Sequence, residues 1–187
     1  MPPGIKITKE DIINAAVGIV RKNGEESINA RTLASALNCS TQPIFSNFAN
    51  MDELRLAVIE KADKLCEEYI QKEVSSEKFP PYKASGMAYI RFAKEEKELF
   101  KLLYMRDRTG EAIPESSALN DRMEGFVQTN TGLADTDARL FHLEMWAYVH
   151  GIATMFATRF FDLEWDLVSR MLSDAYQGLC KQYGMEG

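Results

Sequence analysis

Hydrophobic residues recur at helical spacing along almost the whole chain, and no segment alternates apolar and polar residues as a strand does. Near the N-terminus, Ile13, Ala16, Val17 and Val20 repeat in this way. The same pattern predicts further helices at about 30–37, 41–48, 51–74, 82–95, 97–106, 116–130, 136–161 and 164–183. We therefore expect an all-α fold.

Residues at the expected helix ends support this division. Thr8 followed by Asp11 is a capping-box variant that can satisfy free amides at the start of the first helix. Gly24 supplies the left-handed conformation that ends it. Asn50 and Glu53 form a second box before the long fourth helix. The segments Ser75 to Pro81, Asp107 to Pro114 and Thr131 to Asp135 are expected to be connections.

Three positions between Ala30 and Phe48 predict two short helices that cross steeply. The small side chain of Ala34 lets the two backbones approach each other. Asn38, four residues later, tolerates the positive φ that a tight turn requires. Ile44, six residues further, packs the second helix back onto the first. Core positions beside them are expected at Leu33, Leu37, Phe45 and Phe48. The spacing indicates a helix-turn-helix, whose second helix enters the major groove of DNA.

The second of these helices offers side chains that can contact bases. We expect Ser40 to be its N-cap, which places Pro43 at the third helical position, where its missing amide breaks no bond. With Ile44 inward, Gln42 faces outward and can bond adenine, while Thr41 or Pro43 can touch a thymine methyl group. A solvated polar helix face is the simpler alternative.

Phosphate contacts are expected from Arg31, helped by donors on Asn29, Thr32 and Ser40, with Lys6 reaching from an N-terminal arm. Alternatively, Arg31 forms a surface salt bridge to Glu26. The net charge of −6 disfavours nucleic acid, but residues 1–50 carry +1 and the remainder −7. The expected DNA contacts are Arg31, Thr32, Ser40, Thr41, Gln42, Pro43, Phe45, Ser46 and Asn47.

The segment from Ile12 to Phe48 resembles the tetracycline-repressor family. The resemblance rests on Ala15, Ala16, Gly24, Arg31, Leu33, Ala34, Leu37, Cys39, Ser40, Ile44 and Phe48, followed by Asn50-Met-Asp-Glu-Leu54. Where members often have Tyr and His, this chain has Phe45 and Asn47, so Phe45 lacks a hydroxyl for a phosphate. Trp146, His150 and Gly151 resemble a subgroup of C-terminal domains marked by Trp, His and Gly.

The resemblance implies a two-domain protein, with a DNA-binding domain at residues 1–50 and a helical ligand-binding and dimerisation domain at 51–187. It implies a homodimer formed through the last two helices. The sequence agrees, because Trp146 to Phe161 is apolar on most faces and Gly151, Ala153 and Ala157 permit close approach. The partner helix would offer Leu167, Met171, Ala175, Leu179 and Cys180. An ordinary intrachain core is the alternative.

The resemblance also implies a small-molecule effector bound among helices four to eight. Aromatic and Met side chains gather on the middle helices, as in apolar ligand sites, although such stripes are also typical of cores. His150 could orient the effector, or could be a core imidazole bonded to a carbonyl. The expected ligand contacts are Met87, Phe92, Phe100, Tyr104, Met123, Phe126, Trp146 and His150, with Met145 beside them, and the effector is expected to be largely apolar.

Other classes of protein are disfavoured. No Ser/His/Asp order, phosphate loop or metal spacing is present, and His142 and His150 lie too far around a helix for one metal, so neither an enzyme, a cofactor nor a metal is expected. The apolar stretch Met145 to Thr158 is shorter than a membrane span. Met1 to Arg21 lacks the pattern of a signal peptide, and the three cysteines are scattered, so a cytoplasmic protein is expected.

Two alternatives to a ligand-responsive repressor remain. Cys39 lies beside a helix N-terminus, where a thiolate is favoured, so it could sense oxidants, although a small buried residue in the turn is the simpler interpretation. The weak basic charge also leaves open a helical interaction protein that does not bind DNA.

Overall fold

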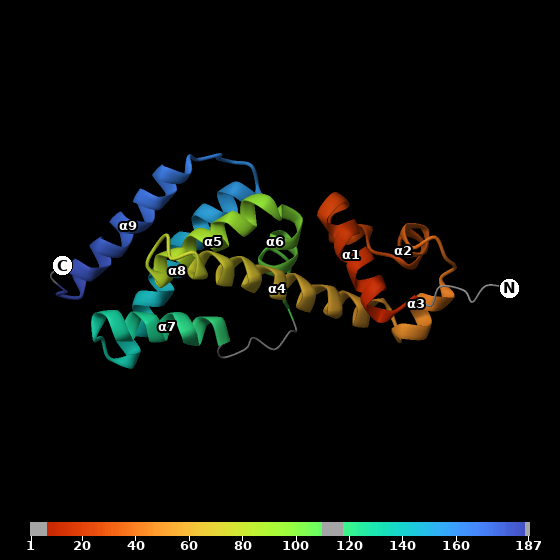
Figure 1. Cartoon of the computed structure of the whole chain (residues 1–187), viewed down its shortest axis with the longest axis horizontal. Helices are drawn as coiled ribbons and strands as arrows, with labels where there is room; N and C mark the ends of the chain where they lie inside the picture. Colours follow the sequence, from red (N-terminus) through yellow and green to blue (C-terminus); the bar gives the residue numbers. More distant parts are fainter. Residues whose placement is uncertain (1–6, 110–117, 186–187) are drawn as a thin grey trace. The chain divides into compact units, whose positions relative to one another are not determined.

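The computed structural model describes residues 7–109 and 118–185, and these are helical throughout apart from turns and connections (Figure 1). The helices are α1 (Lys9–Asn23), η1 (Glu25–Ser27, a 3-10 turn), α2 (Ala30–Ala36), α3 (Gln42–Asn47), α4 (Met51–Ser75), α5 (Pro81–Glu95), α6 (Lys97–Tyr104), α7 (Ala118–Thr131), α8 (Asp135–Ala157) and α9 (Trp165–Gln182). The predicted all-α fold is confirmed. Part of the expected loop, residues 110–114, lies outside the described residues.

The chain divides into two compact units, Met1–Leu65 with Glu96–Arg106, and Cys66–Glu95 with Asp107–Gly187. The division falls within the continuous helix α4, and α6 belongs to the first unit. The functional boundary that the sequence predicts, after residue 50, remains a prediction.

In the first unit, α1 packs against α2, α3 and α6. Its buried residues are Ile12, Ala16, Val17 and Val20, so the inward stripe begins at Ile12 rather than at the predicted Ile13. The Thr8 cap and the Gly24 stop are confirmed: the Thr8 hydroxyl accepts from the Asp11 amide, and Gly24 has φ of +81°. Arg21 donates two hydrogen bonds, of 2.7 and 2.8 Å, to the Glu96 carboxylate before α6.

Helix α4 begins after Asn50, whose side chain accepts from the Glu53 amide at 2.8 Å. The carboxylate of Glu53 accepts from the amide of Ala49 at 2.7 Å, one residue earlier than the predicted box requires. Leu65 and Tyr69, which helical spacing from Leu54 and Val58 predicts to face inward, are only half-buried. The buried stripe of α4 has a spacing of four residues: Leu54, Val58, Ala62, Cys66 and Ile70.

The second unit contains the end of α4 and helices α5, α7, α8 and α9, with α5 packed along α8 and both against α9. Helix α8 ends at Ala157 rather than at the predicted residue 161. The reason is a left-handed residue, Arg159 at φ 59°, after which the Phe160 amide donates back to the Met155 carbonyl at 2.9 Å. Within the part of the chain that the structure describes, no helix is long and apolar enough to cross a membrane.

Candidate functional site

The start of α2 is held by side chains that bond to its free amides. Asn29 Oδ1 accepts from the amides of Arg31 and Thr32, both at 3.0 Å. Thr32 completes a capping box, because its Oγ1 accepts from the Asn29 amide at 3.2 Å. The same Oγ1 donates to the Ser27 carbonyl at 2.8 Å. The Thr32 hydroxyl, expected to donate to a phosphate, therefore already donates to the chain's own backbone, whereas Asn29 caps α2 through its acceptor Oδ1 and not through its donor Nδ2.

The turn after α2 is a Schellman motif. Asn38 has a φ of 50°, as its position in the sequence predicts. The Cys39 amide donates to the Ala34 carbonyl at 2.9 Å, and the Asn38 amide to that of Ser35 at 3.2 Å. Five residues, 37–41, connect α2 to α3, which begins at Gln42.

The core beneath this turn is formed as predicted at Leu33, Ile44 and Phe48, whereas the predicted core position Leu37 is only half-buried. Leu33, Ile44 and Phe48 are almost completely buried and Ala34 is 7% exposed, so the two helices approach closely over the small alanine. The predicted core position Phe45 is wrong, because its side chain is 52% exposed. Phe45 follows the buried Ile44 by one position, about 100° around the helix, and therefore faces solvent.

The predicted cap of α3 is also wrong. The helix begins one residue later than expected, and Thr41 takes the cap position with φ −74° and ψ −12° and no side-chain hydrogen bond. Because the helix begins at Gln42, Ser40 lies one residue before the cap position. Pro43 stands at the second helical position rather than the third, still within the first turn.

The outward side of α3 combines exposed residues with side chains bonded to their own helix. Gln42, Phe45 and Ser46 are exposed, whereas Thr41, Pro43 and Asn47 are half-buried. Ser46 Oγ donates to the Gln42 carbonyl at 2.9 Å, and Asn47 Nδ2 to the Pro43 carbonyl at 2.8 Å. Gln42 and Phe45 thus carry the exposed groups best placed for a partner.

Several cations of the first unit lie in ion pairs. Lys9 pairs with Glu53 at 3.1 Å, Lys61 with Glu10 at 3.1 Å, and Arg55 with Asp52 at 3.0 Å. Arg31 is exposed on the first turn of α2, and the described residues give it no ion pair, neither with Glu26 nor with another acid. Cys39 is a half-buried free thiol.

The expected ligand residues fall in different compact units. Phe100 and Tyr104 lie on α6 in the first unit, with ring centroids 5.0 Å apart. The second unit holds the others: Met87, Phe92, Met123 and Met145 are buried, Phe126 and His150 are half-buried, and Trp146 is exposed. The structure does not place the eight residues in one described cavity.

Two histidine–tyrosine pairs join α5 to α8. Tyr89 Oη lies 2.9 Å from His150 Nδ1, and the Trp146 ring stacks on this imidazole at 4.7 Å. Tyr82 Oη lies 3.1 Å from His142 Nδ1. Burial lowers the pKa of both histidines and raises the pKa of both tyrosines, so all four groups are uncharged at neutral pH. The pair of His142 with Tyr82 was not predicted, because the sequence raised His142 only as a possible metal ligand.

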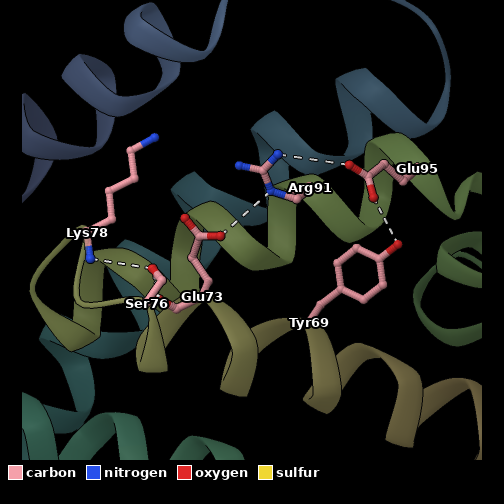
Figure 2. A network of polar contacts seen from close by, with 6 residues as sticks. All are labelled: Tyr69, Glu73, Ser76, Lys78, Arg91 and Glu95. Carbon is pink, nitrogen blue, oxygen red and sulfur yellow. Dashed lines mark hydrogen bonds and ion pairs between the residues drawn. The ribbon is translucent and has the colours of Figure 1, made fainter.

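A hollow of about 500 Å³ opens between α4 and α5 in the second unit, and its walls are charged. Figure 2 shows Arg91 between Glu73 and Glu95, at 3.9 and 4.0 Å, and the Tyr69 hydroxyl donating to Glu95 at 2.9 Å. The walls of the hollow are formed by Glu68, Tyr69, Lys72, Glu73, Arg91 and Glu95. Such a lining does not suit an apolar effector. No group of residues suited to a metal ion occurs among the described residues.

Helices α8 and α9 expose a set of large apolar side chains. On α8, Leu140 and Leu143 are each 49% exposed and Trp146 is 41% exposed, while on α9 Leu167 is 46% exposed. The expected dimer residues Ala153 and Ala157 are instead buried, and Ala175, Leu179 and Cys180 pack on their own chain's core around Phe141. Leu140 and Leu143 were missed, although their spacing opposite Phe141 and Met145 carries the signal.

The helix-turn-helix followed by a helical unit defines the fold class of an all-α regulator. A solved structure described as a TetR-like transcriptional regulator from Rhodococcus sp. RHA1 shares this fold, with a TM-score of 0.69 and 15% identity over 96% of this chain and 98% of that chain. A family model described as tetracyclin repressor-like, C-terminal domain, matches residues 82–175. The chain belongs to the tetracycline-repressor family. No curated protein sequence matches it significantly.

Proposed function

We propose that the chain is a transcription regulator that binds a palindromic operator as a homodimer and leaves it when a small molecule binds. The observation that carries the proposal is the α2–turn–α3 motif, which has a Schellman turn at Asn38 and exposed side chains on the outer side of α3. In such a motif the second helix lies in the major groove. Gln42 is exposed there and suits adenine, and Phe45 offers an apolar contact for a thymine methyl group.

Arg31 supports the proposal by its position and its charge. It is exposed on the first turn of α2, and it has no ion pair within the described ranges, so its guanidinium is available for a phosphate. The other expected contacts, Thr32, Ser40, Thr41, Pro43, Ser46 and Asn47, belong to the same proposed interface. Side chains that are bonded to their own backbone would contribute shape and backbone amides rather than free donors.

The homodimer is proposed from the exposed apolar face of α8 and α9. Leu140, Leu143, Trp146 and Leu167 present large apolar side chains to water, which is unfavourable unless another surface covers them. A second copy covers them with the same face, because a two-fold interface is self-complementary. Two-fold symmetry would also present two α3 helices to two half-sites of one operator.

The response to a ligand is proposed as an equilibrium between two forms of the dimer. The effector binds better to the form with misaligned α3 helices, and α4 carries the change because this continuous helix follows α3 and contributes to both units. Reciprocal linkage then requires operator DNA to weaken effector binding by the same factor, with a coupling of roughly 1–3 kcal/mol. Met87, Phe92, Met123 and Phe126 remain proposed effector contacts, together with Phe100, Tyr104, Trp146 and His150.

The test is the affinity for DNA fragments from the region upstream of the chain's own gene, measured by fluorescence anisotropy over a range of salt concentrations. We expect Arg31→Ala to weaken binding and to reduce the slope of affinity against salt by about one phosphate contact. Arg122→Ala, which removes an exposed arginine on α7, is the matched control and should leave both unchanged. Equal behaviour of the two variants would contradict the proposed role of Arg31.

A further inference from the structure

The two histidine–tyrosine pairs differ in how deeply the imidazole is buried. His150 is half-buried and stacks on Trp146, whereas His142 is only 6% exposed. Nδ1 of His142 contacts the Tyr82 hydroxyl, but its Nε2 is buried and has no hydrogen-bond partner. Buried polar atoms in proteins are normally paired, because an unpaired one loses its hydration without replacement. His142 is therefore a polar group that lacks its partner.

The pair with Tyr82 indicates which atom carries the proton. If Tyr82 donates to Nδ1, the neutral imidazole holds its proton on Nε2, and one polar hydrogen is left unpaired. If Tyr82 accepts instead, both its own hydroxyl hydrogen and the Nε2 lone pair are left without partners among the described residues. We therefore assign Nε2–H to His142, which makes this atom a hydrogen-bond donor.

The side chains packed around Phe141, one residue before His142, are apolar and aromatic. Val127, Ala138, Phe141 and Met145 form the buried centre, and Tyr82, Leu133 and Tyr176 are among the half-buried residues around it. Tyr176 meets the Phe141 ring edge-on, with centroids 5.4 Å apart, and lies 6.0 Å from Tyr82. At its edge, the Glu144 carboxylate accepts from the hydroxyl of Tyr183, which packs against the cluster, at 3.4 Å. A carboxylate at this position disfavours an anionic ligand.

We propose that this aromatic cluster binds a small, uncharged, mainly hydrocarbon molecule with one carbonyl group, whose oxygen accepts from His142 Nε2–H. An apolar wall with a single well-placed donor is the usual construction of such sites. The half-buried side chains of Leu133 and Tyr176 would move aside to admit the ligand, while Tyr82 keeps its hydrogen bond to His142 Nδ1. The inference rests on the proposed effector binding and moves its polar anchor from His150 to His142.

The test uses matched pairs of probes on the full-length protein without DNA. Acetophenone and cyclohexanone carry the carbonyl, while α-methylstyrene and methylenecyclohexane replace its oxygen by CH₂. We expect at least one ketone to shift the Nε2 and Hε2 resonances of His142 in ¹⁵N NMR spectra. We also expect it to bind roughly tenfold more tightly than its hydrocarbon counterpart, the usual effect of one buried hydrogen bond.

Variants connect the preference to His142. His142→Phe should bind ketone and hydrocarbon equally, and His142→Gln, which restores a donor, should recover part of the preference. Tyr69→Phe, which removes a hydroxyl bonded to Glu95 in the same unit, should keep the full preference. If the His142 variants do not fold, the resonance shifts of the wild-type protein decide the question.

Several results would overturn the site. These are unshifted His142 resonances with both ketones, equal affinity for ketone and hydrocarbon, or a long-lived water on Hε2 that no probe displaces. None of these results bears on the proposed DNA binding, which is measured in a separate experiment. Conversely, a chain that ignores DNA but shows the ketone preference would contradict the proposed function and keep the site.

Discussion

Asn38 is the residue on which the reversal between α2 and α3 depends. Its φ of 50° lies in the left-handed region, where asparagine is tolerated and β-branched residues are strongly disfavoured. We predict that Asn38→Val lowers the free energy of unfolding by roughly 1–2 kcal/mol, measured by urea denaturation. The matched change Ala36→Val, at an exposed helical position, should cost only about half a kcal/mol. Equal losses for the two variants would argue against a strained turn.

The histidines of α8 predict how stability depends on pH. Burial lowers the pKa of His142 and of His150 from 6.5, so the unfolded chain takes up protons more readily than the folded one. The stabilisation is present above pH 6.5 and is lost as the pH falls toward the lowered folded-state values. Urea unfolding between pH 7.5 and pH 5 should therefore show falling stability, with a smaller slope in His142→Phe. A flat or rising profile toward pH 5 would exclude buried neutral imidazoles.

At the scale of the helix, the capping box of α1 combines a hydroxyl and a carboxylate. The Thr8 hydroxyl accepts from the Asp11 amide at 3.1 Å. The Asp11 carboxylate accepts from the Thr8 hydroxyl at 2.6 Å and from the Thr8 amide at 2.9 Å, and these two bonds lower the pKa of Asp11. We predict that Thr8→Ala costs about 1 kcal/mol in the free energy of unfolding, read from thermal or urea melts. Ser46→Ala removes a hydroxyl bonded only to its own helix and should change stability little. A silent Thr8→Ala would show that the box contributes nothing.

Helix boundaries were predictable from the sequence where one residue decides them locally. Gly24 and Asn38 end α1 and the α2 turn because each adopts a positive φ that few neighbours allow. The start of α3 was not predictable from Ser40, because packing of Ile44 and Phe48 fixes where the chain enters the helix. The same packing sends Phe45 outward, although its hydrophobicity alone favours the core.

The candidate DNA interface could be predicted from the sequence more fully than the candidate ligand site could. Three spaced positions define the α2–turn–α3 motif, and all three are local in the chain. The ligand site depends on which helices pack together, and hydrophobic spacing does not distinguish a core from a pocket. The predicted ligand residues therefore include Phe100 and Tyr104 of one compact unit and residues of the other, a grouping that stays a proposal, and the orphan donor on His142 was missed.

At the scale of the whole molecule, assembly is predicted to depend on the exposed face of α8. Leu143→Glu places a charge at a side chain that is 49% exposed in one chain and covered in the proposed dimer. We predict a monomer by analytical ultracentrifugation, with normal helical content by circular dichroism. The control variant Glu124→Leu, on α7, should remain dimeric by the same measurement. A dimeric Leu143→Glu protein would mean that the two copies associate through a surface other than this face of α8.

The central claim is that α2, the Asn38 turn and α3 together bind operator DNA. The most direct measurement compares the wild-type chain and Gln42→Ala on an upstream fragment and on a scrambled fragment of the same length, at low and moderate salt. We predict tight binding of the upstream fragment by the wild type, and a loss of about 1–3 kcal/mol in Gln42→Ala that is confined to this fragment. A wild-type protein that binds neither fragment at low salt, or binds both equally, would contradict the account.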